Sequence, residues 1–347
     1  SSNASAGGLR ASPLPKPDPR SADVKQEKWS SPQTWGGEKP PATGEVDLMY
    51  IPEGKILVLD VAHINIRFWV IEGVIIFDDS MDVHMEAEAI IVNGGGLYIG
   101  SEAKPYTKHA EITLHGHWHS PKIPICGIKT IFQTEGVIEM HGKPVKTTWT
   151  ELHATAHKGS TSIVVMDRVD WEAGDHLVIA PTDKPVFNCR IDRQDDCHAE
   201  ERLVRSVQLD TPSEGLSTIE LDAALAYRHV AEVITGPNGE KMDVRAEVGK
   251  LNRNIVVRGS QPIKGRTRYE EDAPEGPPGA EAMGGHMMMT DIGIIRYVEF
   301  NYMGQAFAMG RYPVHWHMSG LNPLSKGEGN AVWHTFNRAF TTHGIHK

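Results

Sequence analysis

The 347-residue sequence predicts an all-β fold, in which a glycine-rich β-domain runs into the coils of a parallel β-helix. Three observations predict it. The chain contains 34 glycines and 22 prolines, which leave little room for helices. Short apolar runs that end at Gly, Asn, Asp or Pro fill residues 34–155. Strand-length runs then recur about 20 to 40 residues apart from Asn254 onward.

The first segment, residues 1–33, is rich in Pro, Ser, Lys and Asp. A segment of this composition cannot bury enough apolar surface to offset the entropy that it loses on ordering. We therefore predict a disordered tail or linker, with Trp29 and Trp35 as anchors of its end on the next domain.

Residues 34–155 form the first predicted domain. Its runs are rich in Val, Ile, Leu and Phe, which favour strands. A small residue at the corner of each short strand suits a coiled ladder, because a sharp turn of the backbone favours positive φ. The runs repeat at an irregular period near 20 residues, which favours β-helix coils over a sandwich.

Residues 156–250 predict a second β-unit, because two apolar strands flank the turn DWEAGD. Residues 251–347 then predict the start of parallel β-helix repeats. The sequence stops at HGIHK, in the middle of this pattern, and a β-helix needs a capped end to protect the edge of its last coil. We therefore expect the natural protein to continue and this chain to be truncated at its C-terminus.

Charge and motifs exclude several functions. The formal net charge is −10, and no cluster of Lys and Arg suggests a nucleic-acid partner. The sequence contains no GxGxxG or Walker A loop for a nucleotide, and no GxSxG elbow for a serine nucleophile. No apolar run approaches the roughly 18 residues of a membrane span.

The three cysteines indicate an oxidising compartment. Cys189 and Cys197 lie eight residues apart in a polar segment, which predicts a loop closed by one disulfide bond. The alternative is a pair of free thiols. Cys126 is then left over and is expected to be buried, and the absence of a CxxC pair argues against zinc held by cysteines.

Several stretches carry a family resemblance. They are TWGGEKPPATGEVDLMYIPEGKILVLD, GGGLYIGSE, IEMHGKPVKTTWTEL and, as the most specific, GRYPVHWHMSG. In these stretches the chain resembles the G8-domain proteins, a family that includes fibrocystin, fibrocystin-like protein and the cell-migration-inducing hyaluronan-binding proteins, among them a transmembrane hyaluronidase. The resemblance covers most of residues 34–347. It implies an extracellular or cell-surface, right-handed parallel β-helix, but some members depolymerise hyaluronan whereas the fibrocystins have no agreed enzymatic activity.

Two histidines on one predicted strand form the main candidate site. Side chains at i and i+2 project from one face of a strand, so His315 and His317 lie about 6.5–7 Å apart and Trp316 faces the other way. His286 joins them if the intervening residues form one coil. We therefore predict a divalent metal, Zn or Ca, at His286, His315 and His317. The alternative is a ladder of stacked polar side chains without a metal.

The remaining histidines predict less. His115, His117 and His119 repeat the i, i+2 spacing, but Gly116 and the following SPKIP predict a solvated turn. The histidines that are isolated in the sequence are expected to be packed or exposed without a function: His84, His109, His141, His153 and His157.

Cleavage of a glycan would need two carboxyl groups, one as acid and one as nucleophile or base. Asp291 precedes a predicted strand close to the histidine block, and we predict it as the catalytic carboxylate beside His315 and His317, with Glu299 as the second candidate. Binding of sugars needs aromatic rings and cations. The predicted ligand-binding residues are Gln305, Arg311, Tyr312 and Trp316. Arg311 is the best candidate for an anionic ligand, because an arginine is hard to bury without a partner.

The sequence therefore leaves two functional hypotheses. The first is an extracellular β-helix that binds, and in one version depolymerises, a hyaluronan-like acidic polysaccharide, in the manner of a glycoside hydrolase. The second is a structural or adhesion module of a cell-surface protein, with another surface or matrix component as its partner. The chemically mixed segment 304–318 favours the first, whereas the net negative charge and the lack of a clear carboxylate pair favour the second.

Overall fold

The computed structural model describes residues 17–183, 197–210, 215–260 and 282–346. These residues form strands and a single short 3-10 helix, η1 (Pro32–Trp35). No helix in these ranges is long and apolar enough to cross a bilayer. The chain divides into two compact units, one made of Ser1–Pro144 with Arg253–Lys347 and the other of Val145–Asn252.

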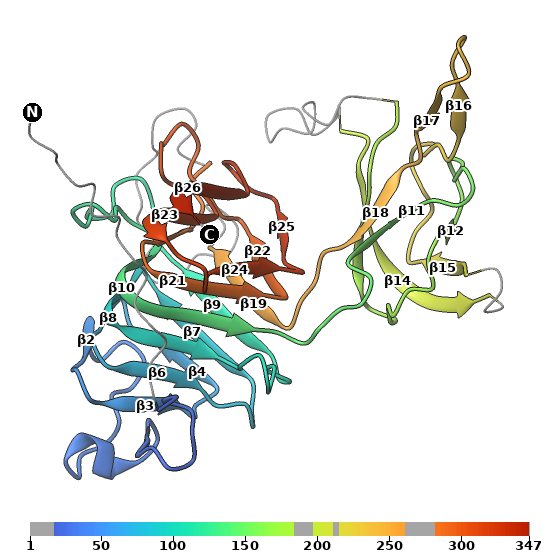
Figure 1. Ribbon diagram of the computed structural model, residues 1–347. Helices are drawn as coiled ribbons and strands as arrows, with labels where there is room; N and C mark the ends of the chain where they lie inside the picture. Colours follow the sequence, from blue (N-terminus) through green and yellow to red (C-terminus); the bar gives the residue numbers. More distant parts are fainter. Residues whose placement is uncertain (1–16, 184–196, 211–214, 261–281, 347) are drawn as a thin grey trace, which may run out of the picture. The chain divides into compact units, whose positions relative to one another are not determined.

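The first unit is a stack of coils built from two parallel sheets (Figure 1). The larger sheet has twelve strands: β1 (Glu27–Lys28), β2 (Leu48–Ile51), β3 (Ile56–Leu59), β5 (Phe68–Ile71), β6 (Val74–Phe77), β8 (Ala89–Ile99), β10 (Thr130–His141), β20 (His286–Met289), β21 (Ile292–Arg296), β23 (Val314–Leu321), β24 (Lys326–Glu328) and β26 (Phe340–His346). The smaller sheet has six: β4 (His63–Asn65), β7 (Val83–Ala87), β9 (Ala110–Leu114), β19 (Ile255–Gly259), β22 (Val298–Asn301) and β25 (Ala331–Trp333).

The pairing pattern confirms the predicted all-β fold with parallel β-helix coils. Each strand pairs in parallel with the strand one coil further along the chain, for example β7 with β9 and β20 with β23. Residues 145–252 interrupt the chain but not the stack, because β19 pairs with β9 and β20 with β10 across this insertion. The predicted domains 34–155 and 251–347 therefore contribute to one continuous stack of coils.

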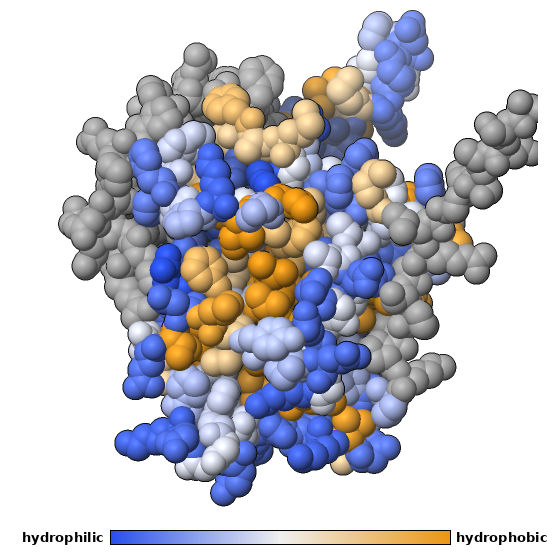
Figure 2. All heavy atoms as spheres, turned by 90° about the vertical axis from the view of Figure 1, so that its left-hand side faces the viewer, coloured by the Kyte–Doolittle hydropathy of each residue, from blue (hydrophilic) through white to orange (hydrophobic). Residues whose placement is uncertain are grey.

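The interior of the coils is apolar because alternate residues of every strand point inward. Ile131 of β10, Met287 and Met289 of β20, and Val314 and Trp316 of β23 all belong to this core. The intervening residues face outward. Figure 2 shows the side of the molecule on which β2, β8 and β10 are labelled in Figure 1. Apolar side chains lie in the middle of this face and polar side chains surround them.

One corner of the coil is a column of glycines. A Cβ on Gly136 would collide with the carbonyl oxygen of Gly95, and a Cβ on Gly95 would collide with that of Gly73. Gly136 also has φ +101°, which disfavours any other residue. Successive turns of backbone thus touch at this corner, as the expected glycine corners require.

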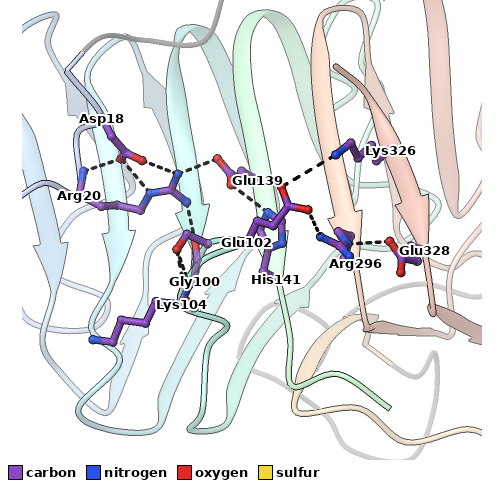
Figure 3. A network of polar contacts seen from close by, with 11 residues as sticks. Asp18, Arg20, Gly100, Glu102, Lys104, Glu139, His141, Arg296, Lys326 and Glu328 are labelled. Carbon is purple, nitrogen blue, oxygen red and sulfur yellow. Dashed lines mark hydrogen bonds and ion pairs between the residues drawn. The ribbon is translucent and has the colours of Figure 1, made fainter. Parts of the chain in front are cut away.

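Composition assigns residues 1–33 to a tail, but residues 17–33 lie against the coils. β1 pairs with β3, and Trp29 is buried in the core. The guanidinium of Arg20 donates to the carbonyl oxygen of Gly100 at 2.6 Å and to Glu139 at 2.9 Å, while Asp18 holds its other edge (Figure 3). The strand pairing and the burial of Trp29, together with these polar contacts, order a segment whose average composition is polar, which composition alone does not reveal.

The second unit is an antiparallel sheet. Its strands, in spatial order, are β11 (Trp149–Glu151), β18 (Glu247–Lys250), β13 (His176–Ile179), β14 (Glu200–Leu209), β15 (Ser217–Leu221) and β12 (Ser162–Val165). A separate hairpin consists of β16 (Val233–Thr235) and β17 (Lys241–Asp243). The unit has its own apolar core, in which Trp171 and Leu177 are buried.

The glycine column makes a stability prediction. Gly136→Ala should lower the free energy of unfolding by about 2 to 4 kcal/mol, because the methyl group meets backbone atoms that cannot rotate away and the φ is unfavourable. Gly94→Ala is the matched control, since Gly94 also has positive φ but nothing within 4 Å of its Cβ. Urea denaturation of both variants checks this, and equal losses of stability would contradict it.

Candidate functional site

Three histidines meet on the outer face of the larger sheet. His315 and His317 lie on β23, and His343 lies on β26 directly opposite His317 in the parallel pairing. The Nδ1 atoms of His317 and His343 are 3.3 Å apart, and the ring centroids of His315 and His317 are 4.9 Å apart. One ligand nitrogen from each of the three histidines lies within 4.8 Å of the others. His315, His317 and His343 thus form one cluster, the histidine trio.

His315 is the buried member of the trio, with an exposed fraction of 2%. Its Nδ1 lies 3.3 Å from the carbonyl oxygen of Gly310, and its Nε2 has no hydrogen-bond partner among the described residues. Burial lowers the pKa of His315 to about 4. The ring is therefore neutral at pH 7, with its lone pair on Nε2.

The structure places His286 outside the trio. β20 and β23 pair so that Met288 lies opposite His315. His286 comes two residues before Met288, and His317 comes two residues after His315. His286 and His317 are therefore about 13 Å apart along the strands. His286 is fully buried and hydrogen-bonds Thr130, and its burial lowers its pKa to about 3, with the charge of Arg311 acting in the same direction.

Arg311 lies beside the histidines, as the sequence order suggests. Its guanidinium is half-buried, packs against Gly127 and donates to the carbonyl oxygen of Ile125 at 2.7 Å. Among the described residues it forms no ion pair with a carboxylate, and burial lowers its pKa. Tyr312 stands edge-on to His315, with ring centroids 5.0 Å apart.

Four other predicted site residues are used inside the fold. The carboxylate of Asp291 is buried and accepts the backbone N–H of Gly136 at 2.9 Å. The side-chain amide of Gln305 donates to the carbonyl oxygens of Ile128 and Gly284. Trp316 faces the core, as the strand period predicts, and donates to the carbonyl oxygen of Gly293. Glu299, the second candidate carboxylate, lies on β22 of the other sheet and accepts from Asn301.

Sequence reasoning missed a second polar cluster, on the smaller sheet. Glu86 of β7 accepts from His115 at 2.8 Å, from His63 at 3.0 Å and from Asn65 at 2.8 Å. His84 pairs with His63 across the coils. The expectation that His84 is isolated is therefore wrong, and so is the assignment of His115 to a solvated turn, because His115 is buried at the end of β9. Trp118 and His119 do lie in a turn.

The signal for this cluster was the repeated i, i+2 spacing of His84 with Glu86 and of His63 with Asn65. His109 also has a partner, since it lies 3.7 Å from Glu111. Burial acts to raise the pKa of Glu86, but the hydrogen bonds from His115 and His63 outweigh burial and hold the pKa at about 2.

The described residues include two of the three cysteines, Cys126 and Cys197. Cys126 is a buried free thiol, as expected. The predicted bridge from Cys189 to Cys197 stays a prediction, because Cys189 lies outside the described residues.

Comparisons with known proteins agree with the resemblance. A G8 domain matches residues 34–153, and a CEMIP β-helix matches residues 282–347. Fibrocystin-L of Mus musculus and fibrocystin-L of Homo sapiens are each 35% identical to the chain, and each match covers 92% of this chain and 8% of the relative. Protein rliB of Dictyostelium discoideum is 26% identical, over 91% of this chain and 25% of its own length. The chain thus spans 8% of the length of the fibrocystin-L relatives.

Among solved structures, one match is the tailspike of the Acinetobacter baumannii bacteriophage AP22 in complex with A. baumannii capsular saccharide. The alignment covers 86% of this chain and 34% of the tailspike chain. Its identity is 12% and its TM-score 0.24, which is too low to support an inference about fold or function.

The Glu86 cluster makes a prediction about pH. The folded pKa of about 2 lies below the usual 4.5, so the carboxylate stabilises the fold above pH 4.5 and this contribution is lost as the pH falls toward 2. Glu86→Gln should therefore lower the free energy of unfolding by about 2 kcal/mol at pH 7 and by much less at pH 3. Denaturation at both pH values measures this, with the exposed Glu135→Gln as control. A difference that does not shrink at pH 3 would contradict the assignment.

Proposed function

The chain belongs to the family of G8-domain and β-helix proteins that includes fibrocystin-L, and from this premise we propose that it binds an acidic polysaccharide outside the cell or at its surface. The proposed contact surface consists of Arg311 and Tyr312, with the histidine trio beside them. One observation carries the proposal, namely that the half-buried guanidinium of Arg311 forms no ion pair with a carboxylate of the described residues.

A half-buried guanidinium loses hydration, and this loss is normally offset by a carboxylate. Arg311 has only the carbonyl oxygen of Ile125 as a hydrogen-bond partner among the described residues. Its remaining N–H groups are suited to a carboxylate or sulfate group, which an arginine can bind through two parallel hydrogen bonds. Repeating uronic acids or sulfated sugars supply such groups.

The surroundings of Arg311 suit a sugar. Phe307, four residues earlier, is 96% exposed and has φ +59°, a backbone conformation that costs energy and is often kept for a function. Its ring and that of Tyr312 offer faces or edges on which pyranose rings can pack. The net charge of the chain is −10, so attraction to an acidic polymer has to come from a local site of this kind.

The proposal is for binding rather than cleavage. Glycoside hydrolysis usually needs two carboxyl groups on either side of the scissile bond. The predicted carboxylate, Asp291, accepts a backbone hydrogen bond inside the fold. Among the described residues, the cluster of ligand atoms at His315 and His317 contains a third histidine and no carboxylate. We therefore expect the polymer to keep its length.

A second candidate is a structural or adhesion module without a glycan ligand. The observation that favours it is the role of Asp291, Gln305 and Trp316, since each of these predicted site residues holds one turn of the coil to another. A module of this kind would bind no free polysaccharide.

Binding of size-defined hyaluronan, measured by isothermal titration calorimetry, tests the proposal. We expect wild-type binding that weakens with added salt, and about 10-fold or weaker binding for Arg311→Gln, because a hydrogen-bonded ion pair contributes about 1.5–3 kcal/mol. Arg338→Gln is the matched control, since Arg338 is exposed in the same region.

Neutral dextran should not bind, and the length of the hyaluronan should stay constant on a sizing column. Equal affinity of the wild type and Arg311→Gln would remove Arg311 from the site. No binding of hyaluronan or of a sulfated glycan would favour the structural module.

A further inference from the structure

We infer that His315, His317 and His343 form a binding site for a divalent transition metal such as zinc, with one coordination position left for another ligand. The inference is independent of the polysaccharide, because it rests on the geometry of the trio alone. It replaces His286 of the sequence-based ligand set with His343, a residue 26 positions beyond His317 that parallel pairing brings opposite it.

The spacing within the trio fits tetrahedral coordination. Zinc–nitrogen bonds are about 2.0–2.1 Å long, and two ligands of a tetrahedron at this bond length are about 3.3 Å apart. The Nδ1 atoms of His317 and His343 are 3.3 Å apart. Their strands pair in parallel at these two residues, so the backbone holds both rings at this distance before a metal arrives.

His315 is prepared as the third ligand by its hydrogen bond to Gly310. A carbonyl oxygen can only accept, so the Nδ1 of His315 carries the proton and Nε2 presents its lone pair. Metal-binding histidines commonly donate their other ring N–H to a backbone carbonyl in this way. The Nε2 atom is buried and lacks a hydrogen-bond partner in the described ranges, which is a cost that a bound metal would remove.

A ladder of polar side chains explains the trio less well. In such a ladder each group donates to or accepts from its neighbour, as His63 and His115 do with Glu86. In the trio, His317 and His343 can share one hydrogen bond between their Nδ1 atoms, but the buried Nε2 of His315 has no partner among the described residues. No carboxylate of the described part of the chain belongs to the trio. Neutral imidazoles without oxygen ligands favour zinc, copper or nickel, whereas calcium takes oxygen ligands.

The cation of Arg311 limits what can occupy the fourth position. Its charge acts on His315, and it would also oppose a second cation nearby. An anionic fourth ligand reduces the repulsion between the metal ion and Arg311, so the site suits a metal with a bound hydroxide or carboxylate. If the proposed function holds, an acidic sugar could supply that carboxylate.

A second set of metal-ligand atoms, His63, His84 and Glu86, lies on the smaller sheet and serves as an internal comparison. The ring nitrogens of His63 and His84 already have partners there, Glu86 at 3.0 Å and Thr113 at 3.0 Å. A metal at this second set would have to replace both of these hydrogen bonds, whereas at the trio it would replace only the one between His317 and His343 and would give the Nε2 of His315 a partner, so we assign the metal to the trio.

Metal binding by the purified chain tests the inference. After treatment with a chelator and its removal, ZnCl₂ is titrated in a calorimeter without any polysaccharide. We expect one zinc per chain. His317→Ala and His343→Ala should each weaken zinc binding by at least about 100-fold. Removing a residue that only hydrogen-bonds a metal ligand already costs up to about 100-fold, and these variants remove a ligand itself. With CoCl₂ as probe, the wild type should give the visible absorption of four-coordinate cobalt, and both variants should lack it.

The controls separate this site from others. His346→Ala removes another exposed histidine of β26, and His63→Ala removes a ligand of the second set; both should bind zinc like the wild type. Far-UV circular dichroism checks that His343→Ala, a change at an exposed side chain, keeps its fold. The inference is overturned if the wild type binds no stoichiometric zinc, if His317→Ala and His343→Ala bind as the wild type does, or if His63→Ala abolishes binding.

Discussion

Direct contact between the backbones of successive coils at the glycine corner sets the geometry of the whole stack. Gly73, Gly95 and Gly136 lie over one another so closely that none has room for a Cβ. Because successive corners touch, the strands that leave them are aligned in the same register from coil to coil. Packing of the apolar interior then follows from the period of two along each strand.

Aligned strands turn the outer face into columns of side chains. One column runs through Ile91, Phe132, Met288, His315 and Thr341, which pair in that order although they span about 250 residues of sequence. Another runs through Asn65, Glu86, Thr113, Arg258 and Asn301. The first leads from apolar residues to the histidine trio, and the second carries the Glu86 cluster. A coil therefore builds sites from residues that are one turn apart.

The insertion of residues 145–252 illustrates how local this constraint is. The unit has its own core and antiparallel sheet, and the coil resumes after it with β19 paired on β9 and β20 on β10. Each coil needs only the coil before it as a template, so a folded insertion between two strands leaves the pairing unchanged. For this reason the regions that match a G8 domain and a CEMIP β-helix share one apolar core.

The β-helix fold, the same-face placement of His315 and His317 and the inward direction of Trp316 could be predicted from the amino-acid sequence. All three follow from glycine corners and from the strand period, which are local properties. Three further features became apparent from the folded chain alone: His343 rather than His286 completes the cluster, Asp291 is used within the fold, and His63, His84 and His115 gather around Glu86. These outcomes depend on which residues of successive coils lie opposite each other. That register is set by the lengths of the intervening loops and by non-local pairing, which no short stretch of sequence encodes.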